Sequence, residues 1–323
     1  MTETRNYRID NIRFVLIVLT VLGHLLLLNR GIFNRMIIRI IYSFHMPAFI
    51  FIMGMLANFS LKKYLKGLIF PYVLFQMAYI LFNRLLFFPD SVYSETFSLQ
   101  FFTPFWLLWY LFTAACYYLP VPVFSKLQTG YFPALFAVSF ALSILVGYAE
   151  SVGYFLSLSR TIVFLPFFIL GFYFKKRTPD SASQNRARSI NRILPVLITI
   201  PIVIFEFIFI QKNVTLKVFY GSYDFAAGNT GAGLRISFMI TAILWIILLF
   251  IVIPNKQIPF VTYVGSYTLP IYLLHGFIIM ILRKVSFFHF TEPVNLLLSL
   301  LFSISLVFLF SLPPIRFAFK KLF

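Results

Sequence analysis

Three histidines and one glutamate stand deep inside strongly apolar stretches of this chain. They are His24 in "TVLGHLLLL", His45 in "YSFHMPAF", His275 in "LPIYLLHG" and Glu206 in "IFEFIFIQK". An ionisable side chain in lipid costs several kcal/mol, so such residues usually face a partner or a water-filled cavity. Imidazole, with an unperturbed pKa of about 6.5, can take a proton from an alcohol and return it near neutral pH. The four residues are therefore candidates for acid–base chemistry within a membrane.

Arg13 lies on the same predicted helix as His24. The step of eleven residues corresponds to about three helical turns and a rise of roughly 16 Å, so both side chains share one face. Arg13 is then close to one membrane surface and His24 lies past the midplane. We predict that His24 is a general base, and that the oxyanion of the reaction is stabilised by His45, His275 or an arginine such as Arg160 or Arg235.

Two simpler interpretations compete with catalysis. A single buried histidine more often packs between helices than it reacts. The three histidines could instead bind a metal, but no pair has the i, i+4 spacing of a helical zinc site, and Glu206 would have to converge from a fourth helix. The lone Cys116 can build neither a disulfide framework nor a thiolate cluster. We predict neither a metal site nor a permanently bound cofactor.

The elements that must position these residues are membrane-spanning helices. Of the 323 residues, 61% are hydrophobic and only 11% are charged, which predicts an all-α, polytopic integral membrane protein. Windows of about 20 residues predict about ten spans. The expected spans are 11–29, 36–59, 65–87, 105–123, 131–148, 160–174, 193–211, 234–253, 262–282 and 293–315.

Basic residues between these spans are concentrated on one side if the spans are counted in order. The positive-inside rule then places both termini in the cytoplasm and accounts for much of the net charge of +18. We attribute that charge to topology and to contact with membrane lipids, not to nucleic acid. The longest polar connection, roughly residues 175–192, has too few apolar residues for a core. Residues 1–323 are predicted to form one transmembrane domain without a soluble domain.

Several motifs resemble the membrane acyltransferase 3 family, in particular its fucose 4-O-acetylase-like branch. They follow one another along nearly the whole chain: "YRIDNIRFVLIVLTVLGH", "FHMPAFIFIMG", "LLWYL", "SRTIVFLPFFILGFYFKK", "GAGLRISF" and "VGSYTLPIYLLHG". The resemblance implies about ten helices and transfer of an acyl group, commonly acetyl from cytoplasmic acetyl-CoA, to an extracytoplasmic or lipid-linked saccharide. It also implies a multi-pass protein of the cell membrane, and we expect a bacterial one.

The resemblance assigns roles to particular residues. Arg13 and His24 match the first-helix motif, in which the histidine is taken as the catalytic base, and Asp10 stands where the family often has an acid. The family often has two arginines three apart at the start of the third helix, whereas this chain has Lys63 and Lys66. Lysine neutralises phosphate as a point charge, without the bidentate fork of arginine. We expect acetyl-CoA to be held by a basic mouth of Arg13, Lys62, Lys63 and Lys66.

The acceptor is expected to enter from the other face of the membrane. Aromatic and fixed polar groups suit sugar rings, which makes Trp109, Arg84, Arg160 and Arg235 candidates for binding it. Trp106 is predicted to be an interfacial anchor instead.

Two other classes of function remain open from the sequence. A carrier or flippase could move a glycan or lipid intermediate, with the histidines as proton relays. A structural scaffold would explain the charge pattern but not the buried histidines and glutamate. The pairing of a basic mouth with a mid-membrane histidine on one helix face favours the enzyme, and the sequence shows no repeated halves of the kind found in transporters.

Overall fold

The protein is built from helices arranged around two central ones. The computed structural model describes residues 6–29, 31–87, 103–152, 155–177, 193–228 and 230–323, and the regular elements within these ranges are all helical. Eight helices are long and apolar enough to cross a membrane. A ninth span results if the bent pair α15 (Pro259–Gly265) and α16 (Leu269–Lys284) is counted as one. The prediction of an all-α, multi-pass membrane protein is confirmed.

The eight spans correspond to eight of the segments expected from hydropathy. One of them combines the short helix α3 (Leu61–Tyr64), a π-helical turn η1 (Leu65–Ile69) and α4 (Phe70–Phe87). The others are α1 (Tyr7–Leu26), α2 (Ile32–Leu56), α8 (Phe132–Leu145) with its flanking turns, α9 (Leu158–Arg177), α11 (Ile193–Gln211), α14 (Ala232–Val252) and α17 (Glu292–Phe310). The chain then continues into the basic helix α18 (Pro313–Leu322).

Two expected spans take another form. The segment 105–123 begins with a 3₁₀ turn, η2 (Trp106–Leu108), and continues into α6 (Trp109–Tyr118), which has only 10 residues. Pro120 then forms the N-cap of a new helix, α7 (Val121–Lys126), because proline has no N–H to continue the preceding one. The segment 262–282 is divided between α15 and α16, whose axes differ by 83°.

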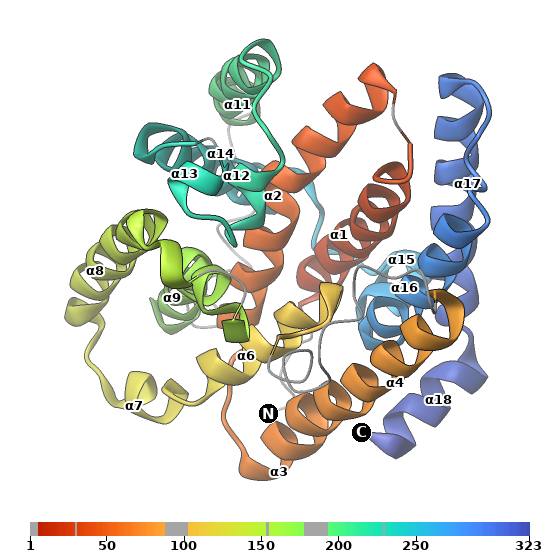
Figure 1. Ribbon diagram of the computed structural model, residues 1–323. Coiled ribbons are helices and arrows are strands. Elements are labelled where there is room, and N and C mark those ends of the chain that lie inside the picture. Colours follow the sequence, from red (N-terminus) through yellow and green to blue (C-terminus); the bar gives the residue numbers. More distant parts are fainter. Residues whose placement is uncertain (1–5, 30, 88–102, 153–154, 178–192, 229) are drawn as a thin grey trace.

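Helices α1 and α2 lie in the middle of the molecule, with α8 and α9 on one side and α16 and α17 on the other (Figure 1). Helices α2 and α9 approach each other backbone to backbone. A Cβ atom at Gly54 would lie 2.2 Å from the Phe168 carbonyl oxygen, and one at Gly171 would lie 2.0 Å from that of Phe51. Small residues at such crossings are typical of membrane helices, where van der Waals packing drives association.

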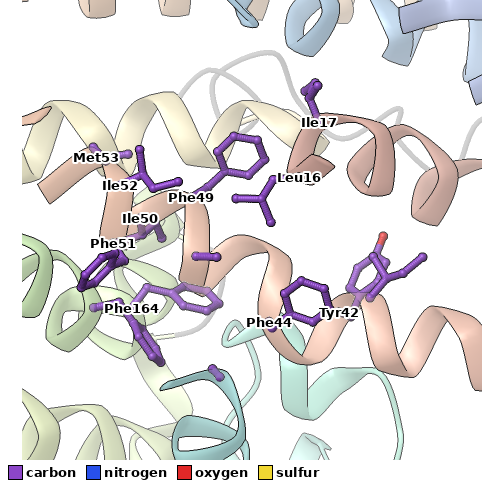
Figure 2. Packing of buried hydrophobic residues seen from close by; sticks show 14 of the residues in the cluster. Leu16, Ile17, Tyr42, Phe44, Phe49, Ile50, Phe51, Ile52, Met53 and Phe164 are labelled. Carbon is purple, nitrogen blue, oxygen red and sulfur yellow. The ribbon is translucent and has the colours of Figure 1, made fainter. Parts of the chain in front are cut away.

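Apolar side chains fill the space around this crossing. Figure 2 shows the aromatic rings of α2, among them Phe49 and Phe51, packed with Leu16 of α1 and Phe164 of α9. The functional helix α1 is therefore held in a tightly packed setting.

Parts of two predicted loops, residues 88–102 and the basic linker from 178 to 192, lie outside the described residues. The cytoplasmic location of both termini stays a prediction.

Candidate active site

The centre of the candidate site is a pair of histidines on two neighbouring helices. His24 Nδ1 of α1 lies 3.0 Å from His275 Nε2 of α16. The two rings are nearly parallel, with an interplanar angle of 4° and 5.3 Å between centroids. His275 is completely buried. The structure thus brings together two of the three histidines that the sequence singles out, although 251 positions separate them.

His45 lies next to this pair without a hydrogen bond to it among the described contacts. Its Nδ1 is 2.7 Å from the Ile41 carbonyl oxygen of its own helix. Its ring packs edge-on against Tyr42 at 4.9 Å, and Tyr42 also contacts His24 edge-on at 6.3 Å. One tyrosine ring therefore lies between His45 and the pair.

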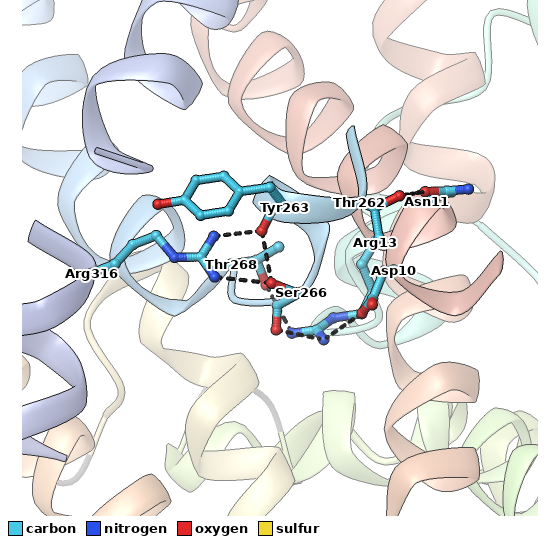
Figure 3. Close-up of polar contacts among 8 residues, drawn as sticks. All are labelled: Asp10, Asn11, Arg13, Thr262, Tyr263, Ser266, Thr268 and Arg316. Carbon is cyan, nitrogen blue, oxygen red and sulfur yellow. Dashed lines mark hydrogen bonds and ion pairs between the residues drawn. The ribbon is translucent and has the colours of Figure 1, made fainter. Parts of the chain in front are cut away.

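Arg13 occupies the other end of the same face of α1, beside the break between α15 and α16 (Figure 3). Its guanidinium donates to the Ser266 carbonyl and to Thr268 Oγ1, both at 3.4 Å, and lies 3.7 Å from the Asp10 carboxylate. The broken turn exposes backbone carbonyls that a continuous helix would have paired, so a buried donor is needed there. Arg13 supplies it.

Arg316 of α18 binds the same break from the opposite side. It donates to the Tyr263 carbonyl at 2.5 Å and to Ser266 Oγ at 2.9 Å, and it stacks on the Tyr263 ring at 4.0 Å. Two guanidinium groups from distant parts of the sequence thus meet at one interrupted helix. No sequence motif distinguished Arg316 from the other basic residues near the C-terminus.

A cavity of about 440 Å³, hereafter the mouth cavity, opens between these elements. Its lining includes Asp10, Arg13, Ser266, Tyr267, Arg316 and Lys320. Three cationic side chains and one carboxylate make it electropositive, which suits a phosphorylated ligand. The lysines predicted for this role, Lys62, Lys63 and Lys66, are exposed on α3 and η1 and are not among the lining residues.

Aromatic rings connect the mouth cavity to the histidine pair. Tyr110 lies near Arg13. The Tyr110 ring contacts Tyr272 at 5.6 Å, and Tyr272 contacts His275 at 6.5 Å. Helices α1 and α16 pack against each other, so the mouth cavity and the histidine pair belong to one structural unit.

Trp106 packs against His24 at a tilt of 50° between the ring planes. Their centroids are 5.1 Å apart, and Arg283 lies 5.8 Å from the centre of the indole. The indole belongs to a residue with a positive φ of 37°, which is strained for a side chain of this size. The role of Trp106 as an interfacial anchor stays a prediction.

Gln76 of α4 fixes the backbone that precedes Trp106. Its Oε1 accepts from the Phe105 N–H at 2.8 Å and its Nε2 donates to the Thr103 carbonyl at 3.0 Å. Sequence reasoning missed Gln76, which the structure buries completely. Its amide within a predicted apolar span was a signal available in the sequence.

The arginines predicted to bind the acceptor lie in different surroundings. Arg160 stacks on Trp109 at 5.0 Å and donates to Ser222 Oγ at 3.3 Å. Arg235 is buried and donates to the Ser143 and Tyr223 carbonyls, at 3.1 and 3.4 Å. It therefore connects α14 to α8 and to the segment of the chain that precedes α14. Arg84 is exposed on α4.

Glu206 is buried among α2, α11 and α14, apart from the histidines. Its Oε1 accepts from Ser43 Oγ at 2.5 Å and from Trp245 Nε1 at 3.0 Å. No hydrogen bond joins it to a histidine among the described contacts, and the described part of the chain brings no three His, Cys, Asp or Glu side chains together to hold a metal ion.

Comparison with protein families decides between the classes of function that such a site could serve. The family model described as an acyltransferase domain, that of the acyltransferase 3 family, matches residues 6–312. The chain belongs to this family. No curated protein and no solved structure matches it.

Membership makes the protein a membrane acyltransferase and gives the geometry a chemical meaning. In this acyltransferase, one face of α1 carries His24 of the imidazole pair towards one end and Arg13 of an electropositive cavity towards the other.

Proposed function

We propose that this acyltransferase moves an acetyl group from cytoplasmic acetyl-CoA to a hydroxyl of an extracytoplasmic or lipid-linked saccharide, with His24 as the general base. The observation that carries the proposal is the placement of Arg13 and His24 on one face of α1, the first lining the mouth cavity and the second in the buried pair. A donor bound at the cavity can extend its thioester along α1 towards His24.

The donor end of the proposal differs from the mouth expected from sequence. Coenzyme A carries phosphates, and the cations lining the mouth cavity are Arg13, Arg316 and Lys320. Arginine forks bind phosphate in a bidentate manner, and the exposed Lys320 can fold over a bound anion. Lys62, Lys63 and Lys66 then contribute as an outer basic surface that attracts the donor. The long, flexible pantetheine arm suits a path lined by Tyr110 and Tyr272.

The reaction itself needs one proton to move twice. His24 takes the proton of the acceptor hydroxyl as its oxygen forms a bond to the thioester carbonyl carbon. The tetrahedral intermediate collapses with cleavage of the C–S bond, and the imidazolium of His24 returns the proton to the departing thiolate. The products are the O-acetylated acceptor and free coenzyme A. Carbonyl carbon, sulfur and proton are all accounted for without a covalent enzyme intermediate.

The acceptor end is proposed to be a saccharide because Trp106 covers His24 with an aromatic face, the type of surface on which sugar rings stack. Such an acceptor agrees with the fucose 4-O-acetylase-like branch that the sequence resembles. The Trp109–Arg160 stack is a second candidate contact for the same acceptor.

A liposome experiment tests this function and separates it from a carrier. The purified full-length protein is given acetyl-CoA labelled in the acetyl group on the side of the mouth cavity, and envelope glycans on the other side. Label covalently bound to glycan, together with free coenzyme A, is the expected result. Movement of unmodified glycan without incorporation of label, abolished by His24→Ala, would instead identify a carrier with His24 as a proton relay.

A further inference from the structure

We infer that His275 is a positioning residue that holds His24 in the tautomer protonated on Nδ1, so that Nε2 of His24 is the basic nitrogen. The role of His24 as a base rests on the proposed function, whereas the tautomer follows from the hydrogen bonds and the burial of the pair. The inference also changes the role expected for His275, which was a donor to the oxyanion.

The argument begins at the carbonyl of Ile271. His275 Nδ1 lies 2.8 Å from this oxygen, and a carbonyl oxygen can only accept. Nδ1 of His275 must therefore carry a proton and donate it. The peptide backbone, which cannot titrate or rotate away within α16, fixes the direction of this first hydrogen bond.

The second step concerns the charge of the pair. His275 is completely buried, and the contacts of the described residues include no ion pair between either histidine and a carboxylate. An imidazolium without a counter-ion in such surroundings carries a large desolvation cost, so His275 is neutral at rest. We take the half-buried His24, which has no carboxylate partner among the described contacts either, to be neutral as well. A neutral imidazole has one N–H and one lone pair. With its proton on Nδ1, His275 has its lone pair on Nε2.

The third step passes this constraint to His24. His275 Nε2 and His24 Nδ1 are 3.0 Å apart, a distance that requires one proton between them. Because His275 Nε2 has none, His24 donates from Nδ1. The lone pair of His24 is then on Nε2, which lies on the far side of the ring from His275. One backbone carbonyl thus selects the reactive nitrogen of a residue on another helix.

The arrangement has a consequence during the reaction. When His24 Nε2 takes the proton of the acceptor hydroxyl, the ring becomes an imidazolium and its Nδ1–H bond to His275 becomes charge-assisted and stronger. A neutral histidine performs the orienting task that a carboxylate performs in a serine hydrolase triad. His275 Nε2 has no hydrogen to offer an oxyanion, so that donor must come from another group.

The tautomer can be measured directly by ¹⁵N NMR on the full-length protein labelled at its histidine ring nitrogens. The chain has four histidines, and replacing each with glutamine assigns the signals. We expect His24 and His275 to be neutral and protonated on Nδ1. His45, whose Nδ1 also faces a carbonyl four residues earlier, serves as an internal reference for that tautomer. A His24 signal protonated on Nε2 would overturn the inference.

Two variants of His275 separate positioning from packing. In His275→Gln a side-chain carbonyl can still accept from His24 Nδ1, whereas His275→Leu keeps the bulk but cannot accept. For His275→Leu, we expect kcat for transfer of label to envelope glycans to fall roughly 100-fold, with KM for acetyl-CoA unchanged. For His275→Gln, we expect kcat to stay close to the wild-type value. Equal losses in the two variants would contradict positioning. His45→Gln is the matched control and should leave the His24 tautomer unchanged.

The spectra and the transfer assay fail independently. If wild-type His24 is protonated on Nδ1 but no glycan becomes labelled, the tautomer stands and the proposed function falls. If glycan is labelled but His24 is protonated on Nε2, the acyltransferase stands and the positioning role falls. Should His275→Leu fail to fold, the wild-type spectrum alone decides the inference.

Discussion

The His24–His275 pair and the Glu206 cluster are two buried ionisable sites in the same bundle, and the sequence selects both by the same argument. Both lie within apolar helices, and both are held by hydrogen bonds from other helices. They differ in what surrounds them. Ring contacts run from His275 through Tyr272 to Tyr110, which lies near Arg13 of the mouth cavity, while Glu206 is enclosed by Ser43 of α2 and Trp245 of α14.

The difference shows that burial of an ionisable group does not by itself indicate chemistry. A reactive group needs a free lone pair and a route for its substrate, and the pair has a candidate for each. Glu206 instead accepts from two helices through one oxygen, an arrangement that fastens α11 to α2 and α14. Polar groups can hold membrane helices together in this way, and each such hydrogen bond contributes a modest free energy of association.

The largest expected effect lies on the histidine side of the comparison. His24→Ala should lower acyl transfer by about 10²–10⁴-fold, the contribution that general acid–base catalysis usually makes. Labelled glycan per unit of protein is the measurement, and the protein should insert and accumulate normally. Glu206→Gln is the matched control, because its side-chain oxygen still accepts from Ser43 and Trp245. Loss of transfer in Glu206→Gln would make the two sites equivalent and break the comparison.

The next effect concerns stability on the Glu206 side. Glu206→Leu leaves the buried Trp245 N–H without its acceptor, whereas Ser43 keeps the Ile40 carbonyl at 2.8 Å. One buried unsatisfied donor costs about 1–3 kcal/mol. We expect a lower thermal unfolding midpoint in detergent, and near-normal transfer by the protein that remains folded. A Glu206→Leu protein that is as stable as wild type but inactive would assign Glu206 to catalysis.

A smaller effect is expected at the mouth cavity. Lys320→Glu should raise KM for acetyl-CoA by about 10-fold and leave the acceptor dependence unchanged, because loss of phosphate neutralisation is a loss of binding. Initial rates over a range of acetyl-CoA concentrations measure it. Lys320 is the suitable cation to change, since it is exposed and Arg13 and Arg316 also support the broken helix. An unchanged KM would remove Lys320 from the donor site.

The smallest effect should come from the lysines of α3 and η1. Lys63→Glu with Lys66→Glu is expected to raise KM for acetyl-CoA by only about 2- to 3-fold at low salt, and the change should disappear as ionic strength rises, because exposed charges act at long range through a screened field. A larger, salt-independent rise than that of Lys320→Glu would place the phosphates against these lysines. Cysteine labelling of the 60–66 segment would reveal any inversion of topology.

The sequence predicted the helical class and a first helix that carries both Arg13 and His24, because both depend on local patterns. Apolar runs of about 20 residues indicate spans, and the step from Arg13 to His24 follows from helical geometry. It could not predict that Pro120 and the turn at Ser266 interrupt two such runs, since a hydropathy window does not register backbone breaks. It also could not place Arg316 beside Arg13 or His275 beside His24, which depends on how distant helices pack.

The break between α15 and α16 has an electrostatic consequence of its own. A helix carries a partial positive charge of about half a unit at its N-terminus. In an unbroken span, this charge would lie at the start of the whole segment, which precedes the break. Because α16 begins anew at Leu269, its positive pole lies beside Arg13 and adds to the field there. This contribution comes from peptide groups, so no side-chain substitution removes it. The mouth cavity of an Arg13 or Arg316 variant therefore keeps part of its attraction for anions.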